Sequence, residues 1–338
     1  MREAAEASAS VKAYLRAAIR PSTRTTYESA LVNYHEYSES RGWKENDPIT
    51  HRKVEEWLAA LADRGRLMTS TIRTYRAALS TYHEETSTLP NPVASGRITR
   101  IVDGIENSRT ECEAMRRREN PKCEGFTPEM FRAIEVRYQQ GSDKELMMIG
   151  ATALLTYTAS RPSEVLGNRT IDSIRADQIR FYAEGSSREP VTATASGIVP
   201  DHCVMELRGS KTNQQQREQT KVVSAKAGVR ALWEWWKRRE EKGGTAIHGI
   251  EFFRLANRLP LSTQNLIGFL TRAAFDAGLG KISIGGKSFR IGSTSTLAAA
   301  GTDAADMRGL GGWQTNMWNT YADSKSKRER AILIGRKL

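Results

Sequence analysis

Two short segments, one near the middle of the chain and one closer to its end, have the residue types and spacing to hold a phosphate group. Arg161 lies three positions before Glu164, where one strongly apolar stretch ends and another begins. Lys287 and Arg290 repeat this spacing with two cations. Arginine presents a planar, permanently charged fork whose N–H groups match the oxygens of a phosphate. These segments therefore predict a site that binds a phosphate ester.

Three further residues extend this candidate set. Lys211 lies in a turn, residues 208–212, between two runs that are typical of strands. Trp313 follows a pair of glycines, and Tyr321 is the only tyrosine after Tyr182. Taken singly, each is more often an ordinary turn or packing residue. Their order along the chain is what makes them candidates for one site.

Familiar enzyme templates are absent from the sequence. It has no GxxxxGK[ST] loop for a nucleoside triphosphate, no HExxH zinc motif and no cluster of carboxylates for a two-metal nuclease. Its three cysteines form no CxxC pair, and their odd number fits a reducing compartment. We therefore expect neither a metal nor a cofactor, and no disulfide between Cys112 and Cys123.

The composition bounds the class of protein. The 338 residues favour two domains, and the 39% of hydrophobic residues, with seven tryptophans, provide for packed cores. Lys and Arg number 51 against 39 Asp and Glu, so the net charge is +12. Such a charge favours a polyanionic partner, most often nucleic acid. No run approaches the ~20 apolar residues of a membrane span, and no signal segment follows Met1, so we expect an intracellular protein that is associated with DNA.

The elements that must position the candidate residues follow from Phe126 onward. Thr127 and Pro128 have the residue types of a helix N-cap and first turn, and residues 144–159 predict a strongly apolar helix. Strand-like runs predict a small antiparallel sheet from residues 178–182, 203–207 and 220–223. Further helices are expected over residues 228–240, 262–278, 289–300 and 304–310.

The first 106 residues read as almost entirely helical. Tyr34 and Tyr37 belong to an apolar stripe and are expected in the core. A short last helix is expected over residues 98–105, and residues 107–125, which lack apolar periodicity, predict a basic interdomain linker. The cations that lie off the apolar stripes offer a surface for phosphates. They are Arg20, Arg24, Arg52, Lys53, Arg64, Arg66, Arg73 and Arg76.

The order of the motifs resembles the tyrosine recombinases, the phage-integrase family. The family pattern is an arginine with Glu or Asp three residues later, a lysine on a β-turn, an HxxR box, an LGH or GGW box and a late tyrosine. The matching residues here are Arg161, Glu164, Lys211, Lys287, Arg290, Trp313 and Tyr321. The resemblance covers roughly residues 127–325, and residues 20–106 more loosely resemble the family's helical core-binding domain.

The resemblance implies a fold that is mainly α with a small antiparallel β-sheet. Residues 1–106 would form an all-helical DNA core-binding domain, and residues 107–125 a basic linker. Residues 126–338 would form a mixed α+β catalytic domain that ends in an oligomerisation segment.

The resemblance also implies a reaction, the cleavage and rejoining of DNA through a 3′-phosphotyrosyl intermediate and a Holliday junction. Tyr321 would attack the phosphorus, and Arg161 and Arg290 would hold the non-bridging oxygens. Lys211 would give the leaving 5′-oxygen its proton.

Two features depart from the family pattern. Lys287 takes the place of the histidine in the HxxR box; a protonated lysine can still bind a phosphate oxygen but cannot act as a general base. Trp313 precedes Tyr321 by eight residues where the family usually has nine, about 100° of rotation along a helix. Lys287 and Trp313 are therefore expected as secondary phosphate contacts, and Glu164 as the residue that orients Arg161.

The implied partner is double-stranded DNA with paired inverted-repeat sites, bound by a homotetramer on two duplexes. Residues 324–338, which place a short apolar patch among cations, would dock on a neighbouring protomer and close a ring of four. Three alternatives remain open. They are a type IB topoisomerase-like enzyme or hairpin-forming resolvase, a catalytically inactive or weakly active sequence-specific DNA-binding protein of the same fold, and a nucleic-acid chaperone that binds by charge alone.

Overall fold

A computed structural model gives the fold of most of the chain. It describes residues 9–19, 21–44, 47–87, 89–119, 123–167, 173–183, 190–191, 198–210, 213–243, 250–254 and 259–311. The chain divides into two compact units, Met1–Pro121 and Lys122–Leu338.

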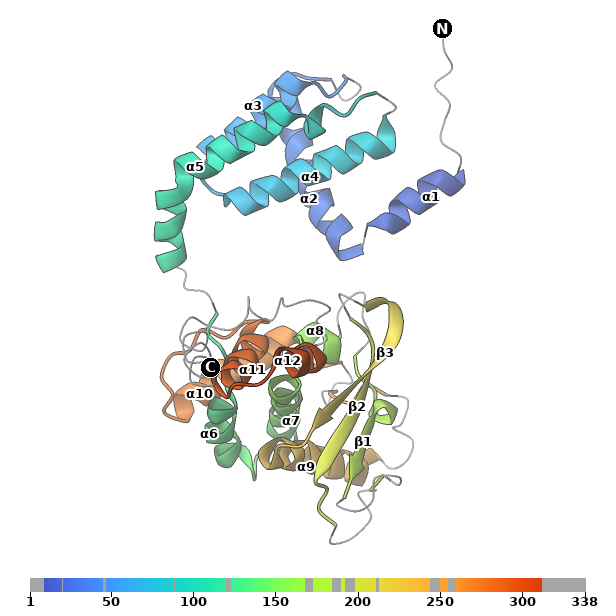
Figure 1. Cartoon of the computed structure of the whole chain (residues 1–338), viewed down its shortest axis with the longest axis vertical. Helices are drawn as coiled ribbons and strands as arrows, with labels where there is room; N and C mark the ends of the chain where they lie inside the picture. Colours follow the sequence, from blue (N-terminus) through green and yellow to red (C-terminus); the bar gives the residue numbers. More distant parts are fainter. Residues whose placement is uncertain are drawn as a thin grey trace. The chain divides into compact units, whose positions relative to one another are not determined.

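The described part of the first unit is helical, as the periodicity predicts (Figure 1). Its helices are α1 (Ala9–Ala18), α2 (Pro21–Ser40), α3 (His51–Asp63), α4 (Thr69–Thr86) and α5 (Gly96–Glu119), with a 3-10 turn at Pro92–Ala94. Thr50 caps α3 by accepting a hydrogen bond from the N–H of Lys53 at 3.4 Å.

The helices of this unit enclose one apolar core. Trp57 is 1% exposed at its centre and donates a hydrogen bond from its indole N–H to the Asn33 side chain at 3.1 Å. Tyr34 and Tyr37 are each 5% exposed and belong to the same core. Their predicted packing role is confirmed, because both rings cover apolar neighbours rather than facing solvent.

Helix α5 is longer than the apolar pattern predicts. A short helix over 98–105 and a linker from residue 107 are expected, but the helix continues through Glu119. Its late anchor is polar: the buried carboxylate of Glu113 accepts hydrogen bonds from the N–H and the hydroxyl of Thr69, both at 2.7 Å. A polar anchor of this kind leaves no trace in hydrophobic periodicity.

The second unit combines helices with a small sheet (Figure 1). Strands β1 (Ile179–Tyr182), β2 (His202–Ser210) and β3 (Asn213–Val223) pair antiparallel in the order β1-β2-β3, which confirms the predicted sheet. The helices are α6 (Pro128–Tyr138), α7 (Asp143–Tyr157), α8 (Pro162–Val165), α9 (Lys226–Gly243), α10 (Thr263–Asp276), α11 (Ser288–Ala299) and α12 (Ala304–Gly311), with a 3-10 turn at Ala176–Gln178.

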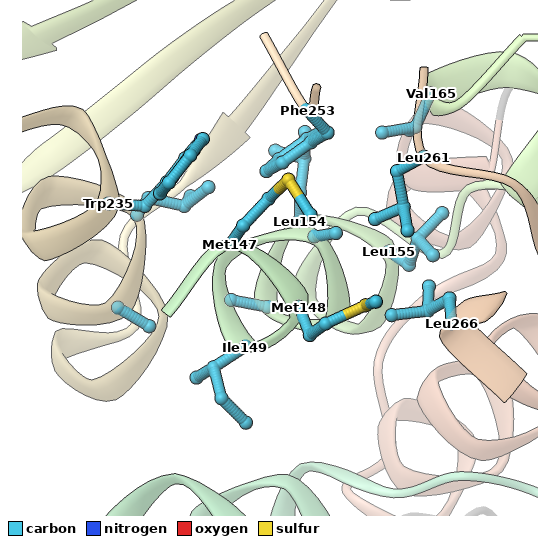
Figure 2. Packing of buried hydrophobic residues seen from close by; sticks show 14 of the residues in the cluster. Met147, Met148, Ile149, Leu154, Leu155, Val165, Trp235, Phe253, Leu261 and Leu266 are labelled. Atoms are coloured by element: carbon cyan, nitrogen blue, oxygen red, sulfur yellow. The ribbon is translucent and has the colours of Figure 1, made fainter. Parts of the chain in front are cut away.

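Helix α7 forms the centre of the second unit's core. Every residue from Leu146 to Thr156 is buried, since α6, α9, α10 and α11 all contact the helix. Figure 2 shows Met147 beside Phe253 and Met148 close to Leu266. A helix buried on all sides cannot rotate without opening the core, so its C-terminal end is a rigid point from which to position a site.

The described residues include all three cysteines and helices α1 to α12. Cys112, Cys123 and Cys203 are free thiols, and burial raises the pKa of Cys203 well above its ordinary value. No helix in the described ranges has both the length and the apolar character to cross a membrane.

Candidate active site

The turn that ends α7 delivers Arg161 to the site. Ala159 is fully buried and has a φ of 48°, in the left-handed region, which reverses the chain direction. The N–H of Ser160 donates back to the carbonyl of Leu155 at 3.2 Å, and the hydroxyl of Thr158 donates to that of Ser160 at 2.7 Å. These bonds hold the turn closed, so Arg161 emerges as the N-cap residue of α8.

Glu164 binds Arg161 from the first turn of α8. Its carboxylate accepts the backbone N–H of Arg161 at 2.8 Å and the guanidinium Nη1 of Arg161 at 2.7 Å. The Arg161 side chain is 22% exposed, whereas that of Glu164 is 3% exposed. The buried carboxylate therefore orients an arginine that reaches solvent.

The same carboxylate also binds Arg290. The guanidinium Nη2 of Arg290 donates to both oxygens of Glu164, at 3.2 and 3.1 Å, and its side chain is only 3% exposed. Glu164 is thus the common partner of two arginines that lie far apart in the sequence. Two guanidinium groups against one carboxylate leave a net positive charge, which suits a phosphate.

Helix α11 is held in place so that Arg290 meets Glu164. The hydroxyl of Ser293 donates to the carbonyl of Thr156, which ties α11 to the end of α7. Gly292 lets the chain at Phe126 approach closely, because a Cβ at Gly292 would stand 2.0 Å from the carbonyl oxygen of Phe126. The N–H of Phe126 in turn donates to the carbonyl of Ser288 at 2.9 Å.

The charges around Glu164 keep it ionised. Burial raises the pKa of Glu164, but Arg290, the backbone N–H of Arg161, Lys221 and the Arg161 guanidinium together outweigh burial and hold that pKa below its ordinary value. Glu164 is therefore a permanent anion at neutral pH.

Lys221 on β3 is a residue that sequence reasoning missed. It is 4% exposed, and its ammonium donates to the carbonyls of Thr158 at 2.9 Å and Leu310 at 3.0 Å. Burial, with Arg290 and Arg161 nearby, lowers the pKa of Lys221 to about 7, although Glu164 opposes the shift. A lysine between Thr220 and Val222 carries no local signal that its side chain points into the domain.

Of the other predicted site residues, the structure describes only Lys287. Lys287 is exposed at the N-terminal end of α11, one turn before Arg290, and it forms no hydrogen bond or ion pair with the described Arg161 or Glu164. Lys211, Trp313 and Tyr321 lie outside the described residues.

Most of the predicted surface cations of the first unit have acidic or polar partners. Arg24 pairs with Glu85 at 3.2 Å, and Arg73 pairs with both Asp103 and Glu106. Arg52 forms an ion pair with Glu56, and Lys53 with Asp47. Arg76 donates hydrogen bonds to the carbonyl of Val93 and the hydroxyl of Thr99, and Arg64 lies over the ring of Tyr37. Arg66 is exposed, and Arg20 lies outside the described residues. A phosphate at this surface would compete with carboxylates for several of these arginines.

Comparisons with known proteins agree with this architecture. Residues 12–86 match the family model described as "Phage integrase, N-terminal SAM-like domain". In structure the chain is similar to the XerH site-specific recombinase bound to a palindromic difH substrate, with 16% identity over 92% of this chain and 79% of that one and a TM-score of 0.59. No curated protein matches the sequence.

Two further solved structures are similar over nearly the whole chain. The Tn1549 transposon integrase in complex with transposon right end DNA has 15% identity over 95% of this chain and 94% of that one, with a TM-score of 0.55. The lambda integrase tetramer bound to a Holliday junction has 15% identity over 93% and 76%, with a TM-score of 0.53. The chain therefore has the fold of the tyrosine recombinases, with an N-terminal helical domain before the domain that holds Arg161 and Arg290.

Proposed function

We propose that this protein is a site-specific DNA recombinase that cuts and rejoins strands through a 3′-phosphotyrosyl intermediate. The observation that carries the proposal is the buried carboxylate of Glu164, which holds the guanidinium groups of Arg161 and Arg290 together. In an enzyme of this fold, the pair would supply the positive charge that clamps the scissile phosphate. Within the family, residues 311–316 also resemble the corresponding segment of Cre recombinase.

The clamp acts on the transition state. When a nucleophile adds to the phosphorus, negative charge grows on the non-bridging oxygens, and two fixed guanidinium groups stabilise that charge without reorganising. Because Glu164 fixes the positions of Arg161 and Arg290 before DNA binds, little ordering is left for the moment of reaction. Loss of one arginine should therefore lower the rate on the order of 10²–10³-fold.

Tyr321 and Lys211 complete the reaction that we propose. Tyr321 loses its proton to solvent, because the cations of the site favour the phenolate, and the phenolate oxygen attacks the phosphorus. The new bond joins tyrosine to the 3′-phosphate, and the bond from phosphorus to the 5′-oxygen breaks. Lys211 gives that 5′-oxygen its proton. The phosphotyrosyl bond conserves the energy of the linkage, so a 5′-hydroxyl can reverse the step without ATP. Lys287 and Trp313 would add phosphate contacts.

We propose a homotetramer on two duplexes with inverted-repeat sites as the working assembly. Recombination of two duplexes cuts and rejoins four strands by way of a Holliday junction, so it requires four active sites. The structurally similar lambda integrase forms a tetramer on such a junction. Residues 324–338 would make the contact between protomers. If deletion of residues 326–338 leaves the tetramer on paired sites intact in analytical ultracentrifugation, this role of the segment is wrong.

The decisive experiment traps the covalent intermediate. DNA fragments that flank the gene are nicked at random. Cleavage beside a nick releases a short oligonucleotide, which carries away the 5′-hydroxyl needed for rejoining, so the enzyme stays covalently bound to its substrate. The reaction runs in EDTA without ATP, and denaturation-resistant protein–DNA adducts are recovered and mapped by mass spectrometry. We expect the adduct on Tyr321, with none from Tyr321→Phe; Tyr182→Phe, which alters a tyrosine of β1, is the matched control.

Other outcomes would identify the alternatives. Sequence-specific binding by the wild-type protein without any adduct would indicate a DNA-binding protein that has lost catalysis. Relaxation of a supercoiled plasmid of arbitrary sequence would indicate a topoisomerase-like enzyme. Binding that has no sequence preference and collapses with salt would indicate a chaperone that acts by charge.

A further inference from the structure

Strand β3 has a lysine at a buried position, where the strand alone does not require a charged residue. On β3 its neighbours Thr220 and Val222 are exposed, so the alternation of the strand turns Lys221 toward the interior, opposite Met205 of β2. It is the only buried lysine in the part of the chain that the structure describes. Burying an ammonium is costly unless polar groups receive it.

The groups that receive it are the ends of two helices. Thr158 is the C-cap residue of α7, and Leu310 lies in the last turn of α12. Carbonyls at helix C-termini have no partner within the helix and carry the negative end of its dipole. The ammonium of Lys221 donates to one carbonyl of each helix, at 2.9 and 3.0 Å. One side chain thus joins β3, α7 and α12.

Helix α12 also has anchors of its own in its described part. Its N-terminus is capped by the carboxylate of Asp303, and Met307 packs against Ala298 of α11. Met307 is its only fully buried side chain among those described. The bond from Lys221 to Leu310 holds the C-terminal end of α12, and the chain continues from that end to Trp313 and Tyr321.

We infer that Lys221 is a positioning residue that ties the C-terminal end of α12, and with it the start of the segment carrying Trp313 and Tyr321, to the turn that presents Arg161. The inference rests on the proposed function. Glu164, Arg161 and Arg290 are the charged groups that face Lys221. The tether joins the part of the chain that holds the phosphate to the part that supplies the nucleophile.

The test compares Lys221→Met with Lys226→Met, which changes an exposed lysine at the start of α9. Methionine keeps the length of the side chain and removes its charge and donors, so the domain can still pack. Hydrogen–deuterium exchange should become about 10-fold faster over residues 304–311 in Lys221→Met and stay unchanged in Lys226→Met. If Lys221→Met does not fold, Lys221→Leu, which also lacks a charge and a donor, takes its place.

Activity supplies the second measurement. On the nicked duplex that traps the wild-type protein, the cleavage rate of Lys221→Met should fall on the order of 10- to 100-fold, while its affinity for the same DNA stays the same. Unchanged exchange at 304–311 overturns the inference, and so does faster exchange with a wild-type cleavage rate. A wild-type protein that forms no adduct overturns the proposed function and this role with it, whereas the exchange data still show whether the tether exists.

Discussion

Arg290 Nη2 donates to both carboxylate oxygens of Glu164, at 3.2 and 3.1 Å, across 126 positions of sequence. Both side chains are 3% exposed, so water does not screen the pair. A charge that is buried with its partner is stable, but either member left alone is not. The pair thus links the integrity of the second unit to the geometry of its site.

Replacing Glu164 should therefore destabilise the protein. In Glu164→Gln the buried Arg290 loses its counter-charge, and we expect the free energy of unfolding to fall on the order of 3 kcal/mol. Glu129→Gln is the matched control, because Glu129 also pairs with an arginine three positions away, but both side chains are exposed. Its effect should stay within about 0.5 kcal/mol in urea denaturation. Equal losses in the two variants would contradict this account.

The same variant predicts an acid dependence. The pKa of Glu164 is lower in the folded chain than its ordinary value of 4.5, so the unfolded state binds more protons as the pH falls through this range. The stabilisation from ionised Glu164 is present above pH 4.5 and is lost as the pH drops through the folded-state pKa. The difference in unfolding free energy between wild type and Glu164→Gln should shrink below pH 4.5, as urea denaturation at pH 3 and pH 7 would show.

Gly292 provides a test of the packing behind Arg290. Gly292→Ala places a methyl group 2.0 Å from the carbonyl oxygen of Phe126, and the atoms that would have to move are backbone. We expect a loss of about 3 kcal/mol or more in the free energy of unfolding. Gly309→Ala, in helix α12 with open space around it, should be neutral or gain up to about 1 kcal/mol. Similar effects of both variants in urea denaturation would show that the close approach is not required.

The helices and strands were largely predictable, because their signals are local. Thr127 with Pro128 marks the start of α6, and the alternation in β1 to β3 marks the sheet. The continuation of α5 to Glu119 was not predictable, since its anchor is the carboxylate of Glu113 on Thr69 rather than an apolar stripe. Hydrophobic periodicity does not register a buried polar contact between distant segments.

The candidate site was likewise predictable only where its signals are local. The motif order singles out Arg161, Glu164 and Arg290, and an arginine with a glutamate three residues later is a local pattern. That one carboxylate serves both arginines is a tertiary fact, which depends on how α11 packs against α7. Lys221 was missed because its role comes from two helix ends that meet its strand only in the folded domain.

Lys221 also predicts an alkaline dependence of stability. Its pKa is 10.5 in the ordinary case and about 7 when folded, so between these values the unfolded state binds a proton that the folded state lacks. Stability should therefore rise with pH from about 7 to 10 by at most about 1.4 kcal/mol per pH unit from this group. Urea denaturation of wild type and Lys221→Met across this range should show the slope only in the wild type. Parallel curves would place the titration elsewhere.

Lys211 can be tested through the leaving group. If it protonates the 5′-oxygen, Lys211→Ala should cleave an ordinary nicked duplex slowly but recover on a duplex with a 5′-phosphorothiolate at the cleaved bond. Sulfur leaves as a thiolate and needs no proton, so the general acid becomes dispensable. Rates from quenched reactions on both substrates measure the rescue. A variant that stays slow on the sulfur substrate would make Lys211 a binding residue.

The left-handed backbone at Ala159 restricts how this part of the protein can vary. A β-branched or bulky side chain at a φ of 48° is strained, and asparagine or aspartate, which tolerate that conformation, would bury a polar group where Ala159 is 0% exposed. Glycine satisfies both demands, and alanine satisfies them at a backbone cost of about 1 kcal/mol. A position with no chemistry of its own is therefore closed to most substitutions, and we expect natural variants to keep one of the two smallest residues two positions before Arg161.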